Sequence, residues 1–284
     1  MQSMSRRPLV SVVMGSYNAG PYIAESIDSV LSQTYSNWEL IVVDDASTDN
    51  TRQMIEEAIK RDSRVHLITR DVNSNRPAVA RNMGLSVASG EFVAFLDHDD
   101  LWYPRKLERH LLAHLKRPDI DLTHSAMLNY PDRVELRSLS ALPNPLQQKV
   151  TAHELRDWNR VMHSSVVAKT GLVRELGGFN ESMQLRAIED YHLWLRLAEV
   201  GRLGFIPEVL GKYRMLTTGT YVQTNQAELR AALASTGVLN GAPSKQVTRV
   251  AVLRKLASLP TKAGLYGVLG PLRGLRGIPP IVIA

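Results

Sequence analysis

The chain has 284 residues, of which 44% are hydrophobic and 22% are charged, and it contains no cysteine. This length and composition fit one large or two modest globular domains. The lack of cysteine excludes disulfide bonds and thiol catalysis but leaves the redox compartment open. Because we identify no signal peptide and no apolar stretch long enough to span a membrane, we expect a cytoplasmic protein.

The net charge of +6 is unevenly distributed. From Leu229 to the end there are eight Lys and Arg residues and no Asp or Glu, so the rest of the chain carries −2. A slightly acidic body, without a basic patch interleaved with aromatic residues, argues against nucleic-acid binding.

Strand and helix patterns alternate through the first hundred residues. Short apolar runs predict strands at 9–14, 39–43, 65–68 and 92–96. Pro21 fits the first turn of one helix, Ser47, Thr48 and Asp49 are N-cap candidates for a second, and a third runs from Pro77 to about residue 88. This alternation predicts an α/β fold with a mostly parallel central sheet and helices on both faces.

The pattern is less regular further on. A helix after Pro104 and a strand at 120–128 precede residues 131–160, whose length and mixed composition suggest a substrate loop. We predict a strand at 164–168, a helix at 170–176, an amphipathic helix from about residue 188 to Gly201, and strands at 205–206 and 209–213. Helices near 224–235 and 246–258 follow.

Polar clusters directly follow three predicted strands, at 16–18, 44–45 and 97–100. Ligands of parallel α/β sheets bind beyond the carboxyl ends of the strands. The acids Asp97, Asp99 and Asp100 repel one another unless a cation lies among them, and hard oxygen ligands suit Mg²⁺ or Mn²⁺. Such an ion usually completes its shell with substrate phosphates, which suggests a metal-bridged diphosphate. An acidic turn that caps the next helix is the alternative.

An ordered set of segments over residues 8–215 resembles the family 2 glycosyltransferases, which have the A-type glycosyltransferase fold. The matching segments are Val10 to Asn18, Ser29 to Tyr35, Glu39 to Asp49, Ala80 to Leu85, Asp97 to Asp100, Gly177 to Glu181, and Glu189 to Leu197. The resemblance implies a catalytic domain at 1–220, with a nucleotide-binding half at 8–115 and an acceptor-binding half at 116–220. Residues 221–284 would form a basic helical C-terminal extension.

The resemblance also implies a role for each matching position. Tyr17 would lie against the nucleotide base, Asp45 would accept the N3–H of a uracil, and Asp97 would contact the ribose or sugar. Asp99 would ligate the Mn²⁺ or Mg²⁺ ion that bridges the diphosphate, and Asp190 would be the catalytic base of an inverting displacement. The remaining candidates are nucleotide-sugar contacts at Ser16, Asn18, Arg81 and His98, and acceptor-side positions at Asp100, Trp102, His163 and Glu189.

Structural roles are open for several of these residues. Tyr17 could cover the edge of the core, and Asp45 could cap the next helix. Glu189 and Asp190 could be ordinary acids at a helix start. His98 and His163 are typical of packing or hydrogen-bonding residues rather than metal ligands, and Trp102 is typical of core or rim.

Two departures from the family refine the expected function. Tyr213-Arg214 is followed by Met215-Leu216, so the His found near the metal in many relatives is missing. Gln246-Val247-Thr248-Arg249 lacks the Trp of the processive Gln-x-x-Arg-Trp element, which favours addition of a single sugar.

The leading hypothesis is therefore transfer of one sugar from a UDP-sugar, or a dTDP-sugar, to a growing glycan, a lipid-linked acceptor or a small molecule. The basic C-terminus could rest on the inner face of a membrane or be a solvated helix. The alternatives are a sugar-phosphate nucleotidyltransferase, whose Gly-rich basic loop is missing after the first strand, and a non-catalytic nucleotide-sugar-binding module.

Overall fold

The parallel half of the sheet comes from the first hundred residues. The computed structural model describes residues 7–131, 138–139, 149–150, 152–157, 159–216 and 226–240. Strands β1 (Val10–Ser16), β2 (Trp38–Asp44), β3 (Val65–Thr69) and β4 (Phe92–Phe95) lie in the order β3-β2-β1-β4, and all are parallel. The four predicted strands are confirmed, with shifts of one or two residues at their ends.

Alternate residues of β1 enter different cores because successive side chains of a strand point to opposite faces. Val12 packs in one core with α1 (Ile23–Leu31), α2 (Thr51–Arg61) and α4 (Lys106–Lys116). Val13 packs on the other face with α3 (Pro77–Val87), α6 (Thr170–Glu175) and α7 (Glu189–Val200). Helices thus cover both faces of the sheet, as predicted.

The second half of the chain extends the sheet beyond β4 and makes it mixed. The order continues β4-β9-β6-β10-β5, with β9 (Val167–Lys169) antiparallel to both its neighbours and β6 (Leu122–Pro131) parallel to β10 (Leu203–Met215). The short strands β7 (Ser138–Leu139) and β8 (Lys149–Val150) pair with β6 and β10. Each antiparallel pairing joins only two or three residues of a strand, so the sheet remains mostly parallel.

Two predictions for this half need correction, and one strand was not predicted. The strand predicted at 164–168 begins only at Val167, because a 3₁₀ turn, η1 (His163–Ser165), precedes it. The two strands predicted at 205–206 and 209–213 form one strand, β10. Its register shifts between Ile206 and Val209, at Pro207, which has no N–H for the ladder, and again between Val209 and Lys212. Strand β5 (Leu101–Trp102), antiparallel to β10, was not predicted, because two residues show no periodicity.

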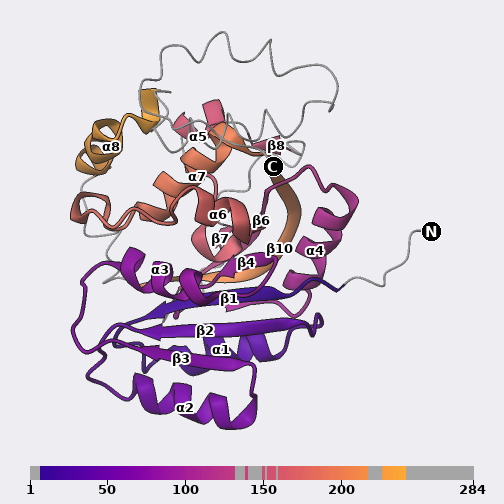
Figure 1. The fold of residues 1–284 in the computed structure, drawn as a ribbon, viewed down its shortest axis with the longest axis vertical. Helices are drawn as coiled ribbons and strands as arrows, with labels where there is room; N and C mark the ends of the chain where they lie inside the picture. The colour runs from indigo at the N-terminus through magenta and orange to yellow at the C-terminus, as the bar shows by residue number, and fades with distance from the viewer. Residues whose placement is uncertain are drawn as a thin grey trace, which may run out of the picture.

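The remaining elements gather at the end of the molecule opposite β3 (Figure 1). They are α5 (Ala152–Asp157), η2 (Met183–Leu185), α8 (Gln226–Ser235) and η3 (Val238–Asn240). Leu233 and Val238 are buried in the same core as Leu185. The helix predicted near 224–235 is therefore present, whereas the one near 246–258 and most of the suggested loop at 131–160 lie outside the described residues. No helix in the described part of the chain is long and apolar enough to cross a bilayer.

Candidate active site

The polar clusters after β2, β1 and β4 meet at one edge of the sheet because these strands are parallel neighbours. The Asp45 amide donates to the Ser16 carbonyl at 2.9 Å, and the His98 Nδ1 lies 3.1 Å from the Gly15 carbonyl. The Ser16 hydroxyl donates to the Val43 carbonyl at 3.3 Å. The three loops are therefore tied together through backbone carbonyl groups.

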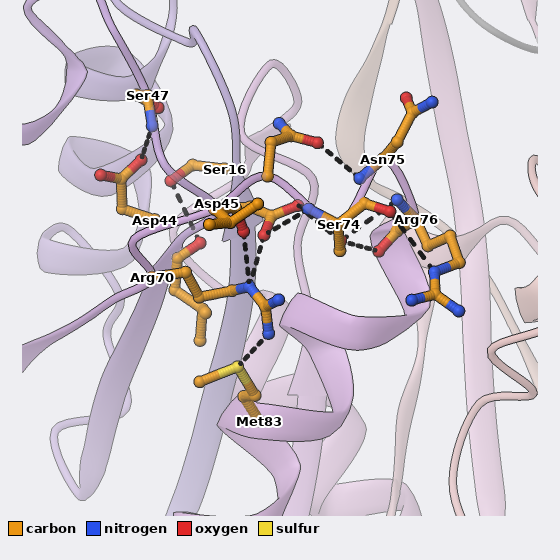
Figure 2. Close-up of polar contacts among 12 residues, drawn as sticks. Ser16, Asp44, Asp45, Ser47, Arg70, Ser74, Asn75, Arg76 and Met83 are labelled. Carbon is orange, nitrogen blue, oxygen red and sulfur yellow. Dashed lines mark hydrogen bonds and ion pairs between the residues drawn. The ribbon is translucent and has the colours of Figure 1, made fainter.

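Asp45 lies in a network of donors from the loop after β3 (Figure 2). Its carboxylate pairs with the Arg70 Nε at 2.7 Å and accepts the Ser74 hydroxyl at 2.6 Å. The Ser74 amide donates to both carboxylate oxygens, at 3.1 and 3.0 Å. Asp45 is 95% buried and does not cap α2. Near the start of that helix, Asp49 accepts the Thr51 amide at 3.0 Å.

The loop after β1 presents Tyr17 and fixes Asn18. The Tyr17 side chain is 46% exposed. Asn18 has a positive φ of 46°, which Asn tolerates better than most residues. Its side-chain oxygen accepts the Thr48 amide at 2.9 Å, and its own amide donates to the Ser47 hydroxyl at 2.9 Å. These bonds fix the backbone of the loop that carries Tyr17, directly after β1.

The acidic loop after β4 holds three carboxylates in different electrostatic states. Burial opposes the ionisation of Asp97, but His163 and Arg81 outweigh it and hold the Asp97 pKa at about 2. Burial raises the pKa of Asp99, with a further increase from Asp97. Burial, Asp99 and Asp97 raise the pKa of Asp100 well above its usual value. Asp97 is therefore held in its ionised form, whereas ionisation of Asp99 and Asp100 is disfavoured in the protein alone.

Arg81 of α3 joins this loop to the start of α7. Its Nη2 lies 2.7 Å from Asp97 Oδ1, and its Nη1 contacts Glu189 Oε1. The next residue, Asp190, is partly exposed. Burial and then Glu189 raise its pKa to about 7, although Arg81 acts in the opposite direction. A carboxylate with a pKa near neutrality is suited to general-base work.

His163 and Trp102 lie beneath the acidic loop rather than at its surface. The His163 ring packs against Phe95, Phe179 and Trp194, with ring-centre distances of 5.2, 5.7 and 6.3 Å. Burial lowers its pKa to about 3, so it is neutral at pH 7. Trp102 is 97% buried, and its indole N–H donates to the Ser164 carbonyl at 2.8 Å. Its ring is therefore packed in the core, and an acceptor sugar cannot stack on it in this conformation.

Arg214 on β10 contacts the acidic loop, although no local sequence pattern indicates this role. Its Nε donates to the Asp99 carbonyl at 2.8 Å, its backbone amide donates to Asp100 Oδ1 at 2.9 Å, and its Nη2 pairs with Glu25 at 2.9 Å. Tyr213 also faces the cluster: burial and then Asp100 raise the pKa of its phenol, with smaller effects from three further acids. The Tyr213-Arg214 pair was noticeable in the sequence, but its contacts span more than a hundred residues.

The acidic loop fits a divalent cation as a single-carboxylate site. Asp99 supplies hard oxygen atoms, is partly exposed, and forms no ion pair among the residues that the structure describes. Within those residues, no group of three His, Cys, Asp or Glu side chains is placed to hold a metal ion. Such a site would rely on substrate phosphates and water for its other ligands, which is usual for Mg²⁺.

A strand-edge site of this kind, with acids after β2 and β4 on a mixed α/β sheet, is typical of enzymes that bind nucleotides. The family model "Glycosyl transferase family 2" matches residues 11–165. EpsE of Bacillus subtilis, which carries a glycosyltransferase name, is 36% identical over 213 residues, 74% of each chain. WfgD of Escherichia coli, a UDP-Glc:α-D-GlcNAc-diphosphoundecaprenol β-1,3-glucosyltransferase, is 35% identical, covering 73% of this chain and 77% of WfgD. The chain therefore belongs to glycosyl transferase family 2.

Solved structures with the same fold agree with this assignment. S. aureus TarS residues 1–349 in complex with UDP-GlcNAc has a TM-score of 0.67 and 21% identity, covering 86% of this chain and 70% of TarS 1–349. A mannosyltransferase from Pyrobaculum calidifontis, in complex with GDP-Man and Mn²⁺, has a TM-score of 0.59 and 20% identity, covering 90% and 77% of the two chains. At these identities the likeness establishes the A-type glycosyltransferase fold.

Proposed function

We propose that this glycosyltransferase moves one sugar from a UDP-sugar to an acceptor hydroxyl, with inversion and with the help of a divalent cation. The observation that carries the proposal is a pair of connections at one edge of the sheet. The loops of Asp45 and Asp99 follow strands that both pair with β1, and Arg81 joins Asp97 to Glu189, the residue before Asp190. The TarS structures with UDP and UDP-GlcNAc support a uridine donor, and the structure with GDP-Man and Mn²⁺ supports a metal.

The donor would lie across the loops after β1, β2 and β4. Tyr17 would cover the base, and Asp45, already oriented by Arg70 and Ser74, would accept the uracil N3–H. Ser16, Asn18 and His98 would line the path from base to diphosphate. A divalent ion at Asp99 would neutralise the charge that develops on the leaving diphosphate.

The acceptor hydroxyl needs a base before it can attack the sugar. Asp190, at the start of α7, would remove its proton, since the raised pKa matches a carboxylate that can hold a proton near pH 7. Direct displacement with one base inverts the anomeric carbon and needs no covalent intermediate. Glu189 lies beside the base, and Asp100 and His163 support the loop from below.

A lipid-linked sugar on a diphosphate is the acceptor class that we favour, in surface polysaccharide biosynthesis. WfgD, whose name describes such an acceptor, aligns with most of this chain. The basic residues from Arg230 onward, most of them outside the described residues, would then bring the enzyme to an anionic membrane surface from the cytoplasmic side.

Calorimetric titration with UDP, dTDP and GDP, each with Mn²⁺ and with EDTA, tests the donor and the metal together. We expect Mn²⁺-dependent binding of UDP. Asp99→Ala should weaken it at least about tenfold, because Asp99 is the proposed metal ligand on the protein. Asp28→Ala, which alters a 53% exposed carboxylate on α1, should leave binding unchanged.

Three results would contradict this assignment. Equal UDP affinity with Mn²⁺ and with EDTA would show that binding does not need a metal. Unchanged Mn²⁺-dependent affinity of Asp99→Ala would show that Asp99 is not the metal ligand. Tighter binding of GDP than UDP would overturn the choice of base.

A further inference from the structure

The guanidinium of Arg81 connects two parts of the site that are far apart in the sequence. Asp97 is the first acid of the loop after β4, and Glu189 is the first residue of α7. Arg81 binds one with each of its two terminal nitrogens, 2.7 Å from Asp97 and in direct contact with Glu189. Arg81 is 92% buried and Glu189 is 97% buried. Such a pair holds its partners together firmly because removal of one member leaves an uncompensated buried charge.

These contacts occupy the groups that a diphosphate would need. Both terminal nitrogens of Arg81 already bind protein carboxylates, and the residue is nearly inaccessible to solvent. Its pKa is raised by Asp97, Glu189 and Asp190 in spite of burial, so it keeps its charge. Arg81 therefore acts on the protein rather than on the phosphates in this conformation.

We propose that Arg81 and Glu189 are a pair of positioning residues: together they fix the start of α7 against the acidic loop, and their opposite charges balance each other beside Asp190. The catalytic consequence of this pair rests on the function proposed above.

The charged and titratable groups near Asp190 come from α7 itself and from elements packed around it. Glu189 belongs to the same helix and Arg81 to α3, and Asp97 follows β4. Tyr213 reaches the cluster from β10, and its raised pKa keeps it neutral. His163 of η1, which faces Arg81 and Asp97, is also neutral at pH 7. Among the described residues, Arg81 is thus the cation that opposes Glu189 and Asp97 at this position.

Removing one or the other member of the pair should shift the pKa of Asp190 in opposite directions. Glu189→Gln removes a neighbouring negative charge, so Asp190 should ionise at lower pH. Arg81→Gln removes the positive charge, so Asp190 should ionise at higher pH. Arg81→Lys keeps the charge, so its Asp190 pKa should stay close to that of the wild type. The Asp190 pKa of the double variant should lie between those of the two single variants, because the two changes compensate.

NMR titration of ¹³C-labelled aspartate carboxyl groups measures this in the full chain without any substrate. The Asp190 signal is assigned as the one that disappears in Asp190→Asn. We expect its midpoint to fall by about 0.5–1 pH unit in Glu189→Gln and to rise by a similar amount in Arg81→Gln.

A second ion pair that involves α7 gives the control. Arg156 of α5 contacts Glu199 near the other end of α7. Arg156→Gln and Glu199→Gln remove charges of the same kind without touching the site, so the Asp190 midpoint should not move.

Unchanged midpoints in folded Glu189→Gln and Arg81→Gln would overturn the proposal, as would shifts no larger than those of the controls. If Arg81→Gln does not fold, Glu189→Gln and Arg81→Lys decide alone: the midpoint must fall in the first and hold in the second. The titration needs no donor or acceptor. A wild-type protein that fails to bind UDP would contradict the proposed function and leave this result standing.

Discussion

The raised pKa of Asp190 follows from where α7 begins. At a helix start the backbone amides favour a carboxylate, and Asp190 Oδ1 accepts the Tyr191 amide at 2.6 Å. Burial and the adjacent Glu189 outweigh this effect and raise the pKa to about 7. The same residue in an exposed first turn would stay ionised and be a weaker base.

We predict that Asp190→Asn keeps UDP binding and loses about 10²–10⁴-fold in transfer rate, the usual contribution of a general base. In the wild type, kcat/KM should fall on acidification below about pH 7, because the base works only when deprotonated and its pKa is about 7. The measurement is the initial rate of sugar transfer between pH 5 and 9. Turnover of Asp190→Asn at the wild-type level, with Glu199→Gln as an unaffected control, would exclude this role.

The local sequence pattern was sufficient to predict where the site residues after β2 and β4 lie, but not where the other site residues lie. Asp45, Asp97 and Asp99 follow apolar strands, so their place at the carboxyl edge could be predicted from short-range periodicity alone. The Arg81–Glu189 contact joins residues 108 positions apart and has no local signal. Trp102 follows the acidic cluster directly, so both an acceptor-side position and a place in the core or at its rim were open from the sequence, and only the packed fold shows that it is buried in the core.

At the scale of elements, the site depends on how closely α3 approaches the sheet. Gly84 faces β1, and a Cβ at that position would lie 2.6 Å from the Val13 Cγ1 and 3.4 Å from the Val43 Cγ2. This close packing places Arg81, one turn earlier on α3, within reach of Asp97. The glycine is needed here for close approach, because its φ is not in the left-handed region.

We predict that Gly84→Ala destabilises the fold by about 1–3 kcal/mol, because overpacking against β1 exceeds the gain in helix propensity. Gly171→Ala in α6 is the matched control, since nothing lies within 4 Å of its added Cβ. That variant should be neutral or up to about 1 kcal/mol more stable. Urea unfolding measures both free energies. Equal stability of the two variants would show that α3 moves away from β1 at no cost.

At the scale of the whole molecule, a row of buried polar side chains, Lys106, His110, Thr123 and His114, connects α4 to the sheet behind the site. Lys106 donates to the Ser165 carbonyl at 2.8 Å and lies 3.2 Å from His110, which in turn lies 2.8 Å from Thr123. Thr123 lies 3.0 Å from His114. Ser165 is the last residue of η1, and the Ser164 hydroxyl of the same turn accepts the Asp97 amide of the acidic loop. This row of side chains therefore connects the site to the helices on the opposite face of the sheet.

The histidines of this region make the fold sensitive to acid. His124 on β6 lies near Lys106 of this row and is 99% buried, and neither ring nitrogen has a hydrogen-bond partner among the described residues. Burial lowers the pKa of His124 to about 3 and that of His114 to about 4. The unfolded chain therefore binds more protons than the fold between about pH 6.5 and these values. Each histidine should contribute a loss of stability on the order of 1 kcal/mol per pH unit in this window as the pH falls.

His124→Phe removes one of these contributions and keeps an aromatic ring against Phe205, whose ring centre lies 5.1 Å away. We predict that the urea midpoint of this variant falls less between pH 7 and pH 4 than that of the wild type. The buried acids act with the opposite sign, since a raised pKa such as that of Asp190 favours the fold on acidification. The difference between variant and wild type cancels their effect. His66→Gln, at an exposed position of β3, should follow the wild type. If His124→Phe follows it too, His124 is charged in the folded protein at pH 4, and the acid sensitivity lies elsewhere.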